Sequence, residues 1–106
     1  MHPILLFQPY TDAEALSVFL EDAERHGHTV RFPDSGSDSG TIQTADPALL
    51  LEAMPEKLRN YLRSGEWTAQ VRLHGEGDLD LPSDLISLCA ELGVGISVWR
   101  SNPEYG

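Results

Sequence analysis

The chain has 106 residues, and 17 Asp and Glu residues against 7 Lys and Arg residues leave a formal charge of -10. A chain of this length is expected to form one domain spanning residues 1–106. The hydrophobic fraction of 41% and the charged fraction of 23% are typical of a globular domain and unlike a disordered acidic tail. Because neutralising phosphates requires clustered Lys and Arg, this composition argues against direct binding to a nucleic-acid backbone.

The sequence also excludes membrane-spanning and disulfide-rich classes. No apolar run approaches the roughly 18 residues that a transmembrane helix requires. The first residues lack a basic region and a long apolar stretch, so we expect no signal peptide. Cys89 is the only cysteine, which rules out an internal disulfide and a cysteine-rich zinc site. These features predict a cytoplasmic protein.

The chain begins with a predicted strand and a predicted helix. Residues 4–7 form a short apolar run, typical of a strand that is buried on both faces. The helix is predicted to begin after Thr11, whose side chain would form a capping box with Glu14. Gly27 is predicted to end this helix in the left-handed conformation.

A loose hairpin is predicted next. Residues 28–32 alternate between apolar and polar side chains, and residues 41–44 could form a short returning strand. Residues 34–40 are rich in serine, glycine and aspartate, which is typical of a mobile, turn-rich connection.

A helical segment follows over residues 47–64. Asp46 directly precedes a proline, which is a typical beginning of a helix. Pro55 interrupts the apolar stripe, so the segment could be one kinked helix or two short helices. Residues 67–74 then alternate more regularly than any other stretch and predict a half-buried strand.

The C-terminal part predicts one more helix and one more strand. The helix is expected to begin near Pro82 and to end at Gly93. Residues 94–98 alternate and predict the last strand, and residues 101–106 are expected to be a frayed tail.

The order of strand, helix, glycine and strand occurs twice, which indicates an α+β fold. Two split β-α-β units would form a ferredoxin-like sandwich, with helices on one face of a mostly antiparallel sheet and residues 47–64 as an additional helical segment. A short mixed-sheet α/β domain is the alternative. The residues expected in the core are Ile4, Leu6, Leu16, Phe19, Leu20, Val30, Phe32, Trp67, Val71, Leu73, Leu85, Leu88, Leu92, Ile96 and Val98.

One stretch could bind a metal. His74, Glu76, Asp78 and Asp80 are alternate residues, and in an extended chain their side chains would share one face. Carboxylates and one imidazole could hold a divalent cation, which would make a small metal-binding or enzymatic domain. The competing interpretation is a flexible acidic loop, because the stretch lacks the fixed glycine and late glutamate of an EF-hand.

No catalytic constellation can be assembled from the motifs present. Residues 36–40 resemble a nucleophile elbow, but an aspartate stands at its middle position and no helix is predicted to follow. Lys57 is the only lysine, and no glycine-rich phosphate loop accompanies it. Cys89 lies on an apolar stripe, as a buried structural thiol does. His26 and His28 flank a helix stop that would point them apart. We therefore expect no enzyme activity and no cofactor.

The two tryptophans are expected to play different parts. Trp67 shares a strand face with apolar residues, so it is predicted to lie in the core. Trp99 has the opposite parity to the apolar residues of 94–98, which predicts an exposed side chain. Exposed tryptophans are common anchors of protein interfaces.

Acidic residues concentrate in the N-terminal half. Residues 1–53 hold nine acids and two bases, a net charge of -7, whereas residues 54–106 hold eight acids and five bases, a net charge of -3. Such a surface either promotes solubility alone or attracts a basic partner protein. The residues predicted to bind that partner are Asp12, Glu14, Glu21, Asp22, Glu24, Glu76, Asp78, Asp80 and Trp99.

The stretch from Leu58 to Trp99 carries a family resemblance. It contains a helix, an alternating strand, an acidic turn, the motif LPSDLI at 81–86 and the motif LGVGISV at 92–98. This pattern resembles the C-terminal half of small bacterial domains of unknown function found among toxin-immunity proteins. The resemblance implies a bacterial or phage protein that neutralises its partner by binding.

The function predicted from the sequence is therefore non-enzymatic inhibition. A rigid acidic surface can occupy the basic groove of a nucleic-acid-processing enzyme, such as a nuclease or toxin, without being a substrate. Immunity proteins and phage anti-CRISPR inhibitors both fit this description. The alternative remains a metal-binding or enzymatic domain built on residues 74–80.

Overall fold

The computed structural model describes residues 3–34, 38–74 and 81–99, and it shows an α+β fold with four helices and a mixed sheet of five strands. The elements in chain order are β1 (Ile4–Pro9), α1 (Ala13–Arg25), β2 (Thr29–Arg31), β3 (Gly40–Gln43), α2 (Pro47–Ala53), α3 (Glu56–Ser64), β4 (Trp67–His74), α4 (Ser83–Leu92) and β5 (Gly95–Trp99). None of the helices in these ranges combines the length and the apolar character that a membrane crossing requires.

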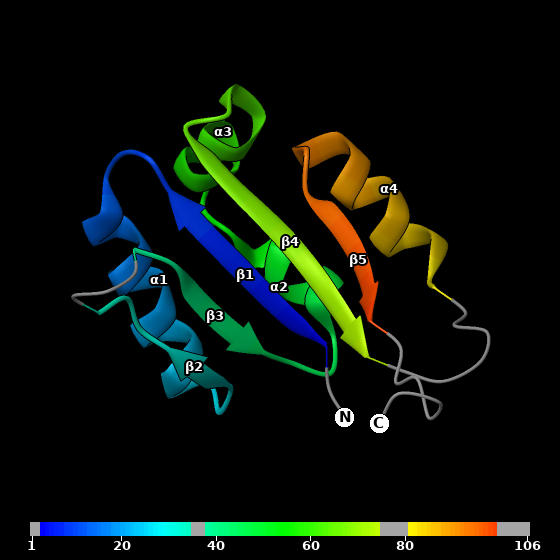
Figure 1. The fold of residues 1–106 in the computed structure, drawn as a ribbon, viewed down its shortest axis with the longest axis horizontal. Helices are drawn as coiled ribbons and strands as arrows, with labels where there is room; N and C mark the ends of the chain where they lie inside the picture. The colour runs from blue at the N-terminus through cyan, green and yellow to red at the C-terminus, as the bar shows by residue number, and fades with distance from the viewer. Residues whose placement is uncertain (1–2, 35–37, 75–80, 100–106) are drawn as a thin grey trace.

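The strands lie in the order β2-β3-β1-β4-β5 (Figure 1). The first three neighbouring pairs are antiparallel, and β4 and β5 are parallel, with α4 as their crossover. Helix α1 packs behind β2 and β3, and α4 packs against α2, α3 and β5. The sheet is thus covered by helices on one face, and the expected β2–β3 hairpin is confirmed.

In the central strand β1, the buried residues alternate with the ones that were predicted to be buried. Leu5 and Phe7 are fully buried, whereas Ile4 and Leu6 are half-buried on the other face. Leu5 lies opposite Val71 in the register, so both point into the helical layer. The prediction of Ile4 and Leu6 as core residues is wrong because a run of four apolar residues contains no alternation from which the buried parity can be read.

The last strand is less buried than predicted. Val98 is 44% exposed, although it lies in register beside the buried Leu73. β5 is an edge strand, so it has a neighbouring strand on one side only. Ile96 is half-buried and packs against the core, while Val94, just before the strand, is buried.

Most of the other predicted core positions are confirmed. The positions that the structure buries are Leu16, Phe19, Leu20, Trp67, Val71, Leu73, Leu85 and Leu92. Val30, Phe32 and Leu88 are partly buried and pack against this cluster. Cys89 is buried, as its place on the apolar stripe of α4 predicted.

The predicted capping box at the start of α1 does not form. Asp12, not Thr11, is the N-cap residue, and it has left-handed backbone angles with φ 52° and no side-chain capping bond. By contrast, the predicted glycines end three helices: Gly27, Gly65 and Gly93 follow α1, α3 and α4, and all three have positive φ values. Without a β-carbon, glycine adopts this conformation at little steric cost.

Pro55 divides the helical segment into two separate helices, α2 and α3, which settles the alternative left open by the sequence. Asp46 caps α2, since its side chain accepts a hydrogen bond of 3.1 Å from the backbone N–H of Leu49. The predicted connection at 34–40 falls partly, and the tail at 101–106 entirely, outside the described residues.

Candidate functional site

The exposed face of α1 carries four of the eight acidic residues predicted to bind a partner. Glu14, Glu21, Asp22 and Glu24 are all exposed, as predicted. Arg25 is the single base on this helix. Within the described residues, Glu14, Glu21 and Glu24 form no ion pair. Their charges therefore remain uncompensated and accessible.

The basic residues of α3 are all engaged within the molecule. Arg59 pairs with Glu56 at 3.0 Å, and Arg63 contacts both Glu56 at 3.2 Å and Glu91 at 3.3 Å. Lys57 pairs with a carboxylate of α1, described below. These bases neutralise acids of the C-terminal half and one residue at the start of α1, which leaves the remainder of α1 negative.

Asp12 differs from the other acids of the predicted binding set. Its carboxylate lies 3.0 Å from the ammonium of Lys57 and accepts a hydrogen bond of 2.9 Å from the Tyr61 hydroxyl. Its side chain is only 28% exposed. Asp12 therefore ties α1 to α3.

This contact shifts the titration of all three groups. The hydrogen bond from Lys57, followed by that from Tyr61, lowers the pKa of Asp12 below its ordinary 3.8. The same contact with the Asp12 carboxylate raises the pKa of Lys57 above its ordinary 10.5. The hydrogen bond to Asp12 also raises the pKa of Tyr61, because it favours the protonated phenol.

Trp67 holds the turn before α1 in place. Its indole N–H donates a hydrogen bond of 2.7 Å to the carbonyl oxygen of Thr11. Its ring stacks on Tyr61 with a centroid distance of 5.5 Å and meets the edge of Phe7 at 6.5 Å. The predicted core position of Trp67 is thus confirmed, and this side chain also fixes where Asp12 and Tyr61 meet.

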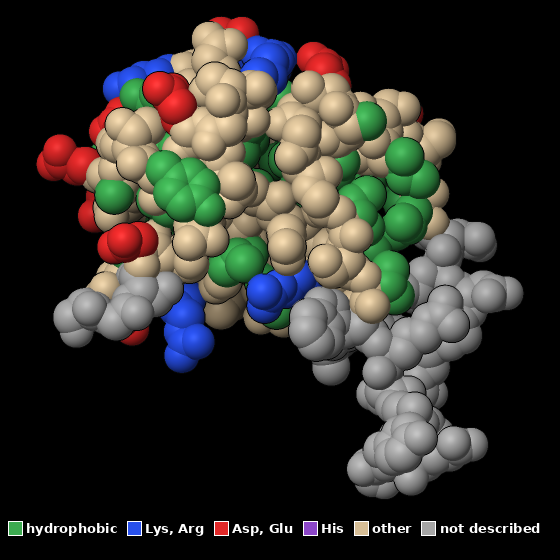
Figure 2. All heavy atoms as spheres, turned by 45° about the horizontal axis from the view of Figure 1, so that its top comes forward, with side chains coloured by type: hydrophobic (Ala, Val, Ile, Leu, Met, Phe, Trp, Pro, Cys, Tyr) green, Lys and Arg blue, Asp and Glu red, His purple; other side chains and the backbone are tan. Residues whose placement is uncertain are grey.

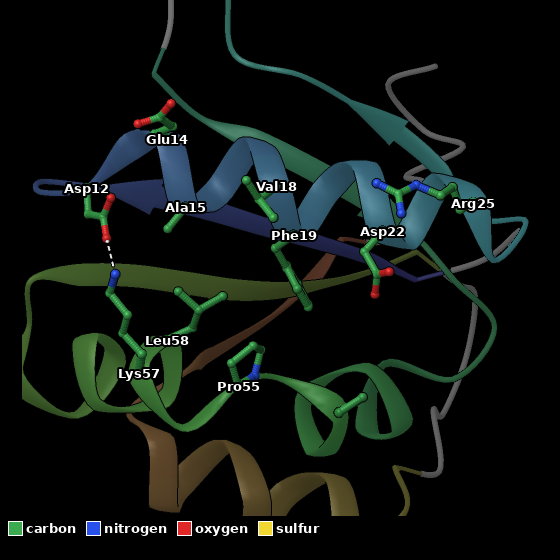
Figure 3. Close-up of a pocket in the computed structure, with 11 residues that line it drawn as sticks. Asp12, Glu14, Ala15, Val18, Phe19, Asp22, Arg25, Pro55, Lys57 and Leu58 are labelled. Carbon is green, nitrogen blue, oxygen red and sulfur yellow. Dashed lines mark ion pairs between the residues drawn. The ribbon is translucent and has the colours of Figure 1, made fainter.

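A groove of about 560 Å³ lies between α1 and the α2–α3 segment. In Figure 3, Phe19 and Asp22 extend from α1 toward this segment, and Pro55 and Leu58 extend back toward α1. The Asp12–Lys57 ion pair bridges the two sides at one end. The walls are apolar and the margin is charged.

Val18 and Asp22 are two accessible groups of this groove. Val18 is 59% exposed although it neighbours the buried Phe19. The carboxylate of Asp22 lies 3.9 Å from the exposed imidazole of His26, whose Nδ1 is 2.7 Å from the Asp22 carbonyl oxygen. No Lys or Arg pairs with Asp22 in the described part of the chain. The groove therefore presents an apolar contact beside a carboxylate.

The described helices leave the opposite face of the sheet uncovered. Gln8, Thr68 and Gln70 are exposed there, on alternate positions to the buried residues of β1 and β4. Figure 2 looks obliquely onto this face: backbone and other side chains are interspersed with hydrophobic groups and a few basic side chains, and acidic side chains stand out at the left and top margins. Arg31 and Arg72 also lie on this face, so its charged groups in β2 and β4 are basic, unlike those of the acidic surface of α1.

The remaining predicted site residues lie outside what the structure describes. Glu76, Asp78 and Asp80 belong to the segment 75–80, and the side chains of His74 and Trp99 are likewise not described. His74 and Trp99 are register partners in the parallel pair of β4 and β5. In residues 3–34, 38–74 and 81–99, no group of three or more His, Cys, Asp or Glu side chains could hold a metal ion.

Sequence patterns did not predict the groove or the network around Asp12. Asp12 and Tyr61 are separated by 49 positions, and Trp67 and Thr11 by 56. Local periodicity places each of these residues on its own element only, and the sheet topology then brings them together.

Comparison with protein-family models, with curated proteins and with solved structures found no match for this chain. The physical properties of the acidic surface and of the groove therefore carry the functional hypothesis.

Proposed function

We propose that this protein is a non-enzymatic binding protein that acts in the cytoplasm and neutralises a basic-surfaced partner protein through the exposed acidic face of α1. One observation carries this proposal. The bases of α3 pair with nearby acids, whereas Glu14, Glu21 and Glu24 carry exposed charges without an ion-pair partner among the described residues.

The placement of these carboxylates suits recognition by charge. They project from one rigid helix whose opposite side is anchored in the core by Leu16 and Leu20. A rigid charged surface loses little conformational freedom on binding. Complementary charge raises association rates by about tenfold to a thousandfold and disfavours partners of the same sign.

The partner class follows from this chemistry. Nucleases and other nucleic-acid-processing enzymes present basic grooves that accept phosphates, and clustered carboxylates can occupy such a groove. We therefore propose an inhibitor of the immunity-protein or anti-CRISPR type. Glu76, Asp78 and Asp80 are included in the proposed binding surface on the basis of the sequence, because they lie outside the described residues.

The proposal is tested by reversing the charge of the α1 face. The triple variant Glu14→Lys, Glu21→Lys and Glu24→Lys removes the exposed acids and leaves the apolar side of the helix unchanged. A matched control reverses three exposed acids elsewhere: Glu52→Lys, Glu66→Lys and Asp84→Lys. Both variants change the net charge equally, and circular dichroism establishes that each is folded.

Tagged wild-type protein and both variants are then used to capture partners from host lysate. We expect one basic protein to be captured by the wild-type protein and by the control variant but not by the α1 variant. The purified pair should reproduce this order of affinity. A partner that binds the α1 variant as tightly as it binds the wild-type protein would refute the proposal.

The sequence predicted β4, α4 and β5 as the second split unit and residues 47–64 as the addition, but β4 and β5 are direct neighbours. We propose instead that the part of the fold up to β4 is ferredoxin-like, with α4 and β5 as an extension. The order β2-β3-β1-β4 and the antiparallel pairings support this assignment. An experimental structure in which β4 lies elsewhere than beside β1 would contradict it.

A further inference from the structure

We infer that the groove between α1 and the α2–α3 segment receives a basic, apolar-anchored peptide segment of the partner protein. This inference rests on the proposed function and specifies how the partner is held after electrostatic attraction. It adds a second type of contact, because an apolar side chain enters the groove while a neighbouring Lys or Arg reaches the carboxylates at its margin.

The groove offers an apolar surface of suitable size. Its volume of about 560 Å³ falls within the range of roughly 300–1,000 Å³ that is common for ligand sites. Val18 is 59% exposed, and Pro55 and Leu58 extend toward it from the other wall (Figure 3). An exposed valine that faces the apolar residues of the other wall gains contacts when an apolar side chain enters and water leaves.

The charges at the margin select a basic segment. The lining contains three carboxylates, of Asp12, Glu14 and Asp22, and two cations, of Arg25 and Lys57, which leaves a net charge of -1. Lys57 is already paired with Asp12 at the end of the groove that this ion pair bridges. Asp22 extends into the groove with only a 3.9 Å contact to an imidazole, so its carboxylate is available to a cation of the partner.

The length of the groove fits a short segment. Its lining residues on α1 run from Asp12 to Arg25, which corresponds to about 20 Å along a helix. An extended peptide covers this distance with about six residues. A segment of that size can place an apolar residue at Val18 and a basic residue at Asp22, because these positions are one helical turn apart.

The probe for this inference is a display library of random short peptides selected against the full-length protein. We expect the enriched peptides to combine an apolar residue with a neighbouring Lys or Arg. In a titration of the isotopically labelled protein, the methyl signals of Ala15, Val18 and Leu58 should shift on adding such a peptide. The methyl signals of Ile86, which lies on α4 and does not line the groove, should remain in place.

Two variants with matched controls test the contacts. Val18→Gln removes the apolar contact without adding charge, and Ile86→Gln is its control because Ile86 is 46% exposed on α4, which does not line the groove. Burial of a valine predicts that Val18→Gln weakens peptide binding about tenfold. Asp22→Asn should weaken it several-fold and reduce its salt dependence, whereas Glu21→Gln should change it less.

Several results would overturn the inference. These are a selection that enriches no basic peptide, peptide binding that is insensitive to Val18→Gln, or self-association in sedimentation experiments that is lost in Val18→Gln. The last result would assign the groove to a second copy of this chain. If the triple reversal in α1 abolishes binding of the partner but Val18→Gln does not, the groove inference fails and the proposed function stands.

Discussion

Replacing Trp67 with phenylalanine tests how the start of α1 is held. The variant removes the indole N–H, which donates a 2.7 Å hydrogen bond to the Thr11 carbonyl oxygen, and leaves that oxygen without this donor. The loss of one such hydrogen bond costs about 1 kcal/mol. Phenylalanine also buries about 50 Å² less apolar area than tryptophan, which adds about 1 kcal/mol at roughly 25 cal/mol per Å².

Trp67→Phe should therefore lower the free energy of unfolding by about 2 kcal/mol, which corresponds to a fall of about 8–16 °C in Tm for a domain of this size. Equilibrium unfolding in urea, followed by far-UV circular dichroism, measures this difference. Tyr10→Phe is the control, because Tyr10 is 66% exposed and its substitution should change stability by less than about 0.5 kcal/mol. A loss below about 0.5 kcal/mol for Trp67→Phe would show that the hydrogen bond and the ring contacts do not anchor this turn.

Three further predictions concern the elements that support the site. In Gly40→Ala, the added β-carbon would lie 2.6 Å from a Leu20 methyl carbon, so urea unfolding should show a loss of about 1–3 kcal/mol. Gly95→Ala is the control, since its β-carbon would meet nothing closer than 3.7 Å. Asp46→Ala removes the N-cap bond of α2 and should cost about 1 kcal/mol, whereas an unchanged urea midpoint would contradict this role. Because Lys57 lowers the pKa of Asp12, the stability from this pair should be present above the unfolded value of 3.8 and lost as pH falls through the lower folded pKa. Asp12→Asn should accordingly reduce the loss of stability over that acidic range in pH-dependent thermal unfolding, and an acid dependence identical to that of the wild-type protein would count against the ion pair.

The sequence predicted the helices better than it predicted the parity of the strands. The helical stripe through Leu16 and Leu20 repeats over three turns and ends at Gly27, so its direction and its buried side follow from periodicity. The apolar run of β1 carries no such information, and the structure buries Leu5 and Phe7. Val98 lies in register with the buried Leu73, as its predicted side of the strand requires, but it is exposed because β5 is an edge strand. Local sequence does not specify which strand is at the edge.

The acidic surface was predicted in part. The exposed positions of Glu14, Glu21 and Glu24 follow from the apolar stripe on the other side of α1. The different role of Asp12 could not be predicted, because its partners Lys57 and Tyr61 lie on another helix and meet it only once the sheet has formed. An acidic residue type alone therefore does not show whether the carboxylate is free to bind a partner protein.

The association rate of the protein with its purified partner, measured by stopped-flow fluorescence at increasing salt, tests the central claim most directly. Screening shortens to about 8 Å at physiological ionic strength, so attraction between exposed charges should weaken steadily with added salt. We expect the wild-type rate to fall with salt, and the triple reversal of Glu14, Glu21 and Glu24 to lower the rate at low salt and flatten this dependence. A wild-type rate that is independent of salt and equal to that of the triple variant would contradict recognition through the acidic face of α1.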